Sequence, residues 1–260
     1  LTPGMDMPRI ERSAGPCVIE RAWLDAYRDS VGLPVGPSLP PLALQLAASP
    51  LHLSILADER FPYKAFGLLH VSQRVDQPAA IPTDASMTLD AFTEPAAPSP
   101  RGARFRLVTE ARVDGKLVQR AETLALAPSG KPSGDRPARE EEAPLGTPRL
   151  AAELDVPENI GRRYAAIAGD FNPIHQHALL AKPFGFKRAI VHGTWTVARA
   201  IHMAGLPTSE SFDLYMRFRK PVSLPSRLTV SAYREDGLDR VRVATRDGKT
   251  VHTDIEVRSR

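Results

Sequence analysis

The chain has 260 residues, of which 42% are hydrophobic and 25% are charged, a balance typical of a globular protein with one large or two small cores. Its formal net charge of +4 arises from 34 basic and 30 acidic residues spread along the chain, which does not predict a nucleic-acid partner. No stretch of about 18 residues is free of strongly polar groups, so the sequence predicts a soluble protein without a membrane span.

The amino-terminal region and the cysteine content indicate the compartment. Residues 1–12 have neither a basic start followed by an apolar run nor a small-residue cleavage site, so we expect an unstructured tail and no secretory signal. Cys17 is the only cysteine, which rules out an intramolecular disulfide and favours a reducing cytoplasm.

The first half of the chain predicts two helices followed by strands. A short helix is expected at residues 20–30 and an apolar helix at residues 42–57. The expected strands lie near residues 67–75, 86–92 and 104–113. The turn tripeptide Asp114-Gly115-Lys116 follows the last of them. After residue 128, Pro, Gly, Glu and Arg dominate, a composition typical of a linker.

The second half predicts the same order of elements. Pro157 suits a first helical turn and Gly169 the position after a helix end, so a short helix is expected at residues 157–168. A second helix begins near His192 and is apolar on nearly every face, which indicates a central, buried position. Four alternating segments follow, separated by Pro-rich and Asp-Gly turns, and they predict an antiparallel sheet.

This repetition indicates an internal duplication. The tripeptide Asp-Gly-Lys occurs at residues 114–116 and again at residues 247–249, at the same place in the same series of elements. We therefore predict an amino-terminal domain at residues 1–130, a linker at residues 131–149 and a carboxyl-terminal domain at residues 150–260.

The candidate catalytic residues lie between Tyr164 and Gly193. Pro173 opposes a continuous helix and pushes Asn172 into an extended conformation, so Asp170 and His175 are expected on one loop that can bring them together. A carboxylate and an imidazole held together can orient a water molecule and transfer its proton, which is general acid–base chemistry.

A second candidate feature is the pair His192-Gly193 at the start of the apolar helix. The first N–H groups of a helix lack internal partners, and glycine lets a ligand oxygen approach the backbone, so Gly193 N–H is a candidate oxyanion donor. Together with Asp170 and His175 this suits the hydration of an α,β-unsaturated thioester, in which the carbonyl gains negative charge while water adds two carbons away.

These residues resemble the (R)-specific enoyl-CoA hydratases, or MaoC-like dehydratases, a family with a Gly-Asp-x-Asn-Pro-hydrophobic-His motif followed by His-Gly. The matching positions are Gly169, Asp170, Asn172, Pro173, Ile174, His175, His192 and Gly193. One departure is Ala168, where the family usually carries Ser, Thr, Gly or Cys. The motif covers only about thirty residues, but it is long and specific.

The resemblance implies an α+β double hot-dog fold, in which each unit is an antiparallel sheet wrapped around a long central helix. It implies that Asp170 and His175 activate the water, that Gly193 N–H binds the thioester oxygen and that Asn172 shapes the loop. The substrate is then a trans-2-enoyl thioester of CoA or acyl carrier protein, the product an (R)-3-hydroxyacyl thioester, and no cofactor or metal is needed. The first half lacks the motif and is expected to complete a pseudo-dimer.

Basic residues near the motif have two interpretations. Lys182, Lys187 and Arg188 form one cluster, and Arg217, Arg219 and Lys220 form another. Each is either a solvated charged face or a binding surface for the phosphates of a carrier such as CoA. Our candidate substrate-binding residues are Asn172, His192, Lys187 and Arg188.

Other interpretations of the motif stay open at this point. Asp170 could bond only to backbone amides, His175 could be a core residue and Gly193 a packing glycine. A metal site could draw on His175, His177, His192 and His202, but no cysteine is near and no carboxylate stands at a helical ligand spacing.

Two further function classes share this fold: an acyl thioesterase and a non-catalytic acyl-binding subunit. The predicted pseudo-dimer could also stand alone or pair again as a homodimer.

Overall fold

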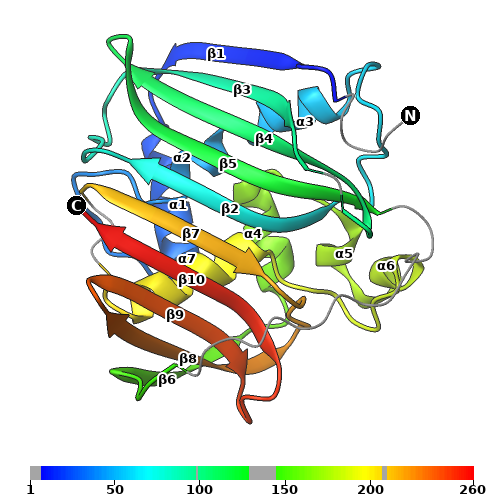
Figure 1. The fold of residues 1–260 in the computed structure, drawn as a ribbon, viewed down its shortest axis with the longest axis vertical. Coiled ribbons are helices and arrows are strands. Elements are labelled where there is room, and N and C mark those ends of the chain that lie inside the picture. Colours follow the sequence, from blue (N-terminus) through cyan, green and yellow to red (C-terminus); the bar gives the residue numbers. More distant parts are fainter. Residues whose placement is uncertain (1–6, 98, 129–144, 207–209) are drawn as a thin grey trace.

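The computed structural model describes residues 7–97, 99–128, 145–206 and 210–260. These residues form an α+β fold in which one ten-stranded antiparallel sheet curves around helices that cover its inner face (Figure 1). The expected hot-dog arrangement, a sheet wrapped around helices, is present. The predicted linker at residues 131–149 lies mostly outside the described residues.

The strand order confirms the predicted duplication. The strands of the first half are β1 (Glu11–Cys17), β2 (Leu69–Gln77), β3 (Met87–Pro95), β4 (Gly102–Val113) and β5 (Lys116–Pro128). Those of the second half are β6 (Leu150–Val156), β7 (Phe212–Phe218), β8 (Ser226–Glu235), β9 (Leu238–Thr245) and β10 (Val251–Ser259). The sheet order is β1-β3-β4-β5-β2-β7-β10-β9-β8-β6. Read from each outer edge inward, the two halves have the same connectivity.

The two halves meet where β2 pairs with β7 at the centre of the sheet (Figure 1). Val75 lies opposite Leu214 in this pairing, and both side chains are fully buried. Helices also bind across the junction, since the Trp23 indole donates to the carbonyl oxygen of Ile167 at 2.9 Å and the Trp195 indole to that of Ser30 at 2.8 Å. The halves therefore share one continuous core.

Helices occur at the four predicted positions, one of them broken in two, and three short helical segments between residues 173 and 184 were not predicted. They are α1 (Arg21–Val31), α2 (Ala43–Ala47), α3 (Ser49–Leu56), α4 (Ile160–Ala168), α5 (Pro173–Gln176), α6 (Ala178–Ala181), η1 (Lys182–Phe184) and α7 (Gly193–Met203). The single helix predicted at residues 42–57 is wrong, because the chain breaks between α2 and α3 and Pro50 occupies the first turn of α3. No helix in the described part of the chain is long and apolar enough to cross a membrane.

Two Asp-Gly turns close tight hairpins as predicted, whereas Asp247-Gly248 lies in a longer connection between Thr245 of β9 and Val251 of β10. Asp114 and Gly115 have φ values of 49° and 76°, and Asp236 and Gly237 have values of 50° and 75°. Positive φ at both central residues is the geometry of the tight hairpin turn that matches strand twist, and Asp-Gly adopts it with little strain.

The outer strands β1 and β6, which among the described strands pair only with β3 and β8, were not predicted. β1 consists mostly of polar or small, exposed side chains and has no apolar alternation. β6 does alternate, with Leu154 and Val156 buried and Glu153 and Asp155 exposed, but it is short and follows the predicted linker directly. The expectation of an unstructured tail over residues 1–12 is wrong for residues 7–12, because Met7 and Ile10 are buried in a satellite core and β1 begins at Glu11.

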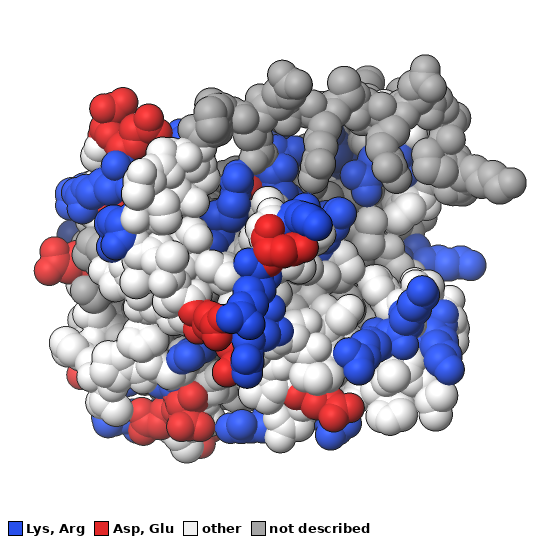
Figure 2. Space-filling view, turned by 90° about the horizontal axis from the view of Figure 1, so that it is seen from below, with Lys and Arg blue, Asp and Glu red and all other residues white. Residues whose placement is uncertain are grey.

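The outer face of the second half carries ion pairs between strands. Arg227 contacts Asp155 at 2.7 Å across β8 and β6, and Arg240 contacts Glu256 at 3.5 Å across β9 and β10. Figure 2 shows Lys and Arg side chains interspersed with Asp and Glu on the face that it draws. Opposite charges at neighbouring positions support the pairing of the strands.

A chain made only of residues 150–260 is expected to self-associate, because β7 then loses β2 and exposes its backbone edge. Light scattering after size exclusion should give a dimer or larger species for this half. A monodisperse monomer would show that β2 is not needed to cover β7.

Candidate active site

The motif folds into a turn between two helices. Gly169 ends α4 with φ of 69°, and Asn172 then caps α5 by accepting a hydrogen bond from Ile174 N at 3.3 Å. Asn172 is extended as predicted, but Pro173 begins a short helix and does not exclude one, because the first helical position needs no N–H donor. His175 therefore lies on a helical turn, while Asp170 lies on the preceding loop.

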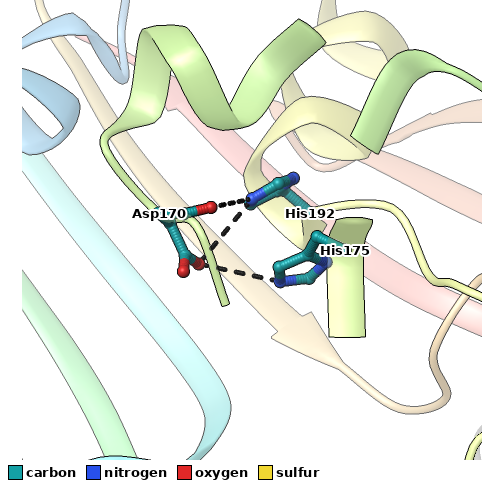
Figure 3. Close-up of side chains that lie close together, drawn as sticks. All are labelled: Asp170, His175 and His192. Carbon is teal, nitrogen blue, oxygen red and sulfur yellow. Dashed lines mark hydrogen bonds and ion pairs between the residues drawn. The ribbon is translucent and has the colours of Figure 1, made fainter. Parts of the chain in front are cut away.

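The structure brings Asp170, His175 and His192 together (Figure 3). Asp170 Oδ1 accepts from Asn172 N at 3.1 Å, which orients the carboxylate. Asp170 Oδ2 lies 3.6 Å from His175 Nε2 and 3.8 Å from His192 Nε2. The Asp170 side chain is half exposed, whereas both histidines are buried, so the carboxylate is the part of the cluster that faces solvent.

One hydrogen bond fixes the tautomer of His175. Its Nδ1 lies 2.8 Å from the carbonyl oxygen of Ile190, which can only accept, so Nδ1 must donate. In the neutral ring the proton is then on Nδ1, and Nε2 presents its lone pair toward Asp170. Carboxylate and imidazole nitrogen face each other as two acceptors at 3.6 Å, too far apart for a direct hydrogen bond. A water molecule that donates one hydrogen to each satisfies both.

His192 supports this arrangement through contacts with both Asp170 and His175. Its Nε2 donates to the backbone oxygen of Asp170 at 3.0 Å, and its ring stacks on His175 with centroids 3.7 Å apart and planes at 23°. Tyr164 packs against the other side, with its ring centroid 5.2 Å from that of His192. His192 thus holds the Asp170 loop through the backbone, a contact that the sequence did not predict.

Burial keeps both site histidines neutral. It lowers the pKa of His175, an effect that the Asp170 charge and the Ile190 carbonyl oppose. Burial and the neighbouring His175 lower the pKa of His192 to about 4, again against the Asp170 charge. At neutral pH the cluster therefore contains one carboxylate and two uncharged imidazoles.

Gly193 is the first residue of α7 and is packed closely. A Cβ atom built on it would lie 2.4 Å from Cε1 of Phe218, so a larger residue requires the ring to move. Within the described residues Gly193 N–H has no hydrogen-bond partner, as expected for the first turn of a helix. Close packing and an available N–H donor thus coexist at this residue.

The predicted substrate-binding cations lie close to the site along the chain. Lys187 and Arg188 are exposed on the segment between η1 and α7, just before the buried residues that lead to His192. Neither forms an ion pair with another described residue. Their position suits an anionic group outside the catalytic cluster.

The alternative metal set is only partly brought together. Ligand atoms of Asp170, His175 and His192 lie within 4.8 Å of one another. However, Nε2 of His192 already donates to a backbone carbonyl and has no lone pair to offer a metal there. His177 instead caps α6 through Leu179 N, and His202 lies in the last turn of α7.

The first half also reaches the site, which the motif alone could not reveal. Ser49, at the start of α3, lies 3.6 Å from where a Cβ on Gly169 would stand. On β2, His70 packs against Phe218, the residue that covers Gly193. The pairing of β2 with β7 brings His70 beside Phe218.

The free energy of unfolding is expected to fall as the pH drops from about 6.5 toward 4. The folded-state pKa values of His52 and His192 are lowered from 6.5 to about 4, so in this window the unfolded chain binds more protons and is favoured. Urea melts at several pH values measure the effect, and His52→Gln should reduce the slope. A free energy that stays constant or rises on acidification would contradict it.

Gly161→Ala is expected to lower activity from outside the cluster. The new Cβ on α4 would lie 2.2 Å from the backbone oxygen of His175, so α5 must shift and move the imidazole. The turnover number and the unfolding midpoint should both fall, although alanine normally stabilises a helix interior. Gly36→Ala is the control, because no atom lies within 4 Å of that Cβ position. Unchanged turnover in Gly161→Ala would show that α5 tolerates the shift.

Comparisons with known proteins identify the family of the chain. Residues 140–257 match the family model described as MaoC like domain. The chain is 30% identical over 227 residues to 3-hydroxyacyl-thioester dehydratase X of Mycobacterium tuberculosis, an alignment that covers 84% of this chain and 78% of that protein.

Solved structures extend the likeness to nearly the whole fold. The crystal structure of HtdX of Mycobacterium tuberculosis has a TM-score of 0.82 at 26% identity and covers 96% of this chain and 100% of that one. A MaoC-like dehydratase from Phytophthora capsici has a TM-score of 0.77 at 16% identity, with 99% and 96% covered, and shares the fold. The chain therefore belongs to the MaoC-like dehydratase family and has its hot-dog fold.

Proposed function

We propose that this protein catalyses the reversible hydration of trans-2-enoyl thioesters to (R)-3-hydroxyacyl thioesters, which makes it a hydro-lyase. The observation that carries the proposal is the pair of acceptors, Asp170 Oδ2 and His175 Nε2, that face each other at 3.6 Å. The relative from Mycobacterium tuberculosis bears the name of a 3-hydroxyacyl-thioester dehydratase, which supports the reaction class. The stereochemistry follows from the motif's resemblance to (R)-specific hydratases.

In this proposal the substrate carbonyl binds at the start of α7. Gly193 N–H donates to the thioester oxygen and stabilises the enolate that forms during addition. The positive end of the α7 dipole acts in the same direction. The site binds the carbonyl through an N–H donor, so polarisation needs neither a cofactor nor a metal.

The water molecule is held between Asp170 and His175. Its oxygen forms a bond to C3 of the enoyl group while the pair removes one of its protons, and a proton is delivered to C2 as the enolate collapses. The His175 tautomer supports this, because Nε2 is free to accept a proton and Ile190 stabilises the resulting cation through Nδ1. Dehydration follows the same steps in reverse.

Other residues serve binding in this proposal. Asn172 shapes the catalytic loop through its cap on α5 and His192 holds the loop by its backbone. Lys187 and Arg188 bind phosphates of CoA or of the phosphopantetheine arm of acyl carrier protein. We propose further that the domains are residues 1–130 and 150–260, that they act as a pseudo-dimer which can pair again as a homodimer, and that the protein works in the cytoplasm without a nucleic-acid partner.

Asp170→Asn and His175→Ala are each expected to lower kcat by about 10² to 10⁴, because the first replaces a carboxylate with a neutral amide that cannot take up a proton and the second removes the imidazole. Circular dichroism and unfolding midpoints should stay close to wild type for Asp170→Asn, whose side chain is half exposed. Matched controls are Asp29→Asn, a side chain 81% exposed on α1, and His202→Gln at the far end of α7. Near-wild-type turnover in both catalytic variants would refute the assignment.

The assay also separates the alternative functions. With crotonyl-CoA, hydration removes the enoyl absorbance without releasing a thiol, a thioesterase releases CoA, and a binding subunit does neither. Kinetics with trans-2-enoyl-CoAs of increasing length and chiral analysis of the product then define chain length and stereochemistry.

A further inference from the structure

A bulge in β2 turns His70 toward the inner face of the sheet. His70 pairs with Ala125 and Ser72 with the adjacent Leu124, so Val71 is an extra residue on β2. Side chains alternate along a regular strand, so without the bulge His70, three residues before the fully buried Gln73, would face the opposite side of the sheet. The bulge therefore places a histidine of the first half on the side where the helices and the catalytic cluster lie.

A single side chain, the ring of Phe218, links His70 to the start of α7. Its imidazole packs against Phe218 of β7, with centroids 4.5 Å apart and planes at 57°. Phe218 in turn covers Gly193, whose N–H is the proposed oxyanion donor. In Figure 3 the cyan ribbon of β2 runs on the side of Asp170 that faces away from His175 and His192.

The charge of the catalytic carboxylate also affects the pKa of His70. Burial lowers its pKa to about 4, and the Asp170 charge opposes this shift. His70 nevertheless keeps an exposed surface. Behind it lies His52, which bonds to Thr109 Oγ1 at 2.8 Å and whose pKa His70 helps to lower. His70 is thus an accessible imidazole, neutral at pH 7, with no salt bridge to any described residue.

We propose that His70 contacts the substrate and that the first half thereby completes the active site. A thioester with its carbonyl at Gly193 and its C3 beside Asp170 lies next to the Phe218 ring, where the neutral imidazole can make one hydrogen bond to it. This deepens the proposed function and rests on it. The first half, which lacks the motif, then contributes a substrate-contacting side chain on the side of the site that faces Asp170.

Four variants separate hydrogen bonding from packing. His70→Ala removes both, His70→Phe keeps the ring against Phe218 without polar atoms, and His70→Gln keeps a hydrogen-bonding group. We expect kcat/KM with crotonyl-CoA to fall about tenfold in the Ala and Phe variants and to be largely restored in the Gln variant. His202→Gln is the control on α7. The proposal is overturned if the Ala variant keeps wild-type kcat/KM, or if Phe restores it and Gln does not.

A binding measurement keeps this test independent of turnover. The ring resonances of His70 are identified as those lost in His70→Gln, and butyryl-CoA, which cannot be hydrated, is added to the wild-type protein. A shift of these resonances at saturation supports the contact, and unchanged resonances overturn it. Wild-type hydration together with unaffected His70 variants refutes this inference alone. A wild-type protein that neither hydrates crotonyl-CoA nor binds butyryl-CoA refutes the proposed function and this inference together.

Discussion

The hydrogen bond from His175 Nδ1 to the carbonyl oxygen of Ile190 is the constraint on which the catalytic arrangement depends. It decides which nitrogen carries the proton, and so makes Nε2 an acceptor opposite a carboxylate. The same segment is tied back to the motif, because Ile190 N donates to the carbonyl oxygen of Ile174 at 2.9 Å. Backbone pairing between α5 and the entry to α7 thus fixes the chemistry of one side chain.

The duplication places α5 and the start of α7 in a half of the chain that packs against a second, similar half. Both tryptophans of the chain, Trp23 and Trp195, donate hydrogen bonds across the junction of the halves, one in each direction. The end of α1 copies that of α4, since Gly32 and Gly169 adopt φ values of 71° and 69°, but Leu33 follows in the first half where Asp170 follows in the second. The second half contains the catalytic loop, and the first half packs against the helices that position this loop.

The sequence was sufficient for the features that local chemistry determines. The Asp-Gly turns, the buried helix α7, the end of α4 at Gly169 and the conjunction of Asp170 with His175 could all be predicted, because spacing and turn chemistry specify them. Strand β1 could not, because its side chains are mostly polar or small and exposed. Strand β6 was missed although it alternates, because it is short and directly follows the predicted linker. The position of His70 near the active site could not be predicted either, because it depends on long-range strand pairing and on a bulge, and neither can be read from the local sequence.

The extra residue Val71 decides which side chain β2 presents at this end of the strand. If Val71 were deleted, His70 would stay opposite Ala125 and on the same face as Gln73, because Ser72 alone would then separate the two residues. If Val71 were instead paired regularly, Val71 would face inward and His70 would turn to the outer face, while Gln73 and Val75 kept their places in the core. The local pairing of one residue therefore determines whether an imidazole or an aliphatic side chain lies beside Phe218.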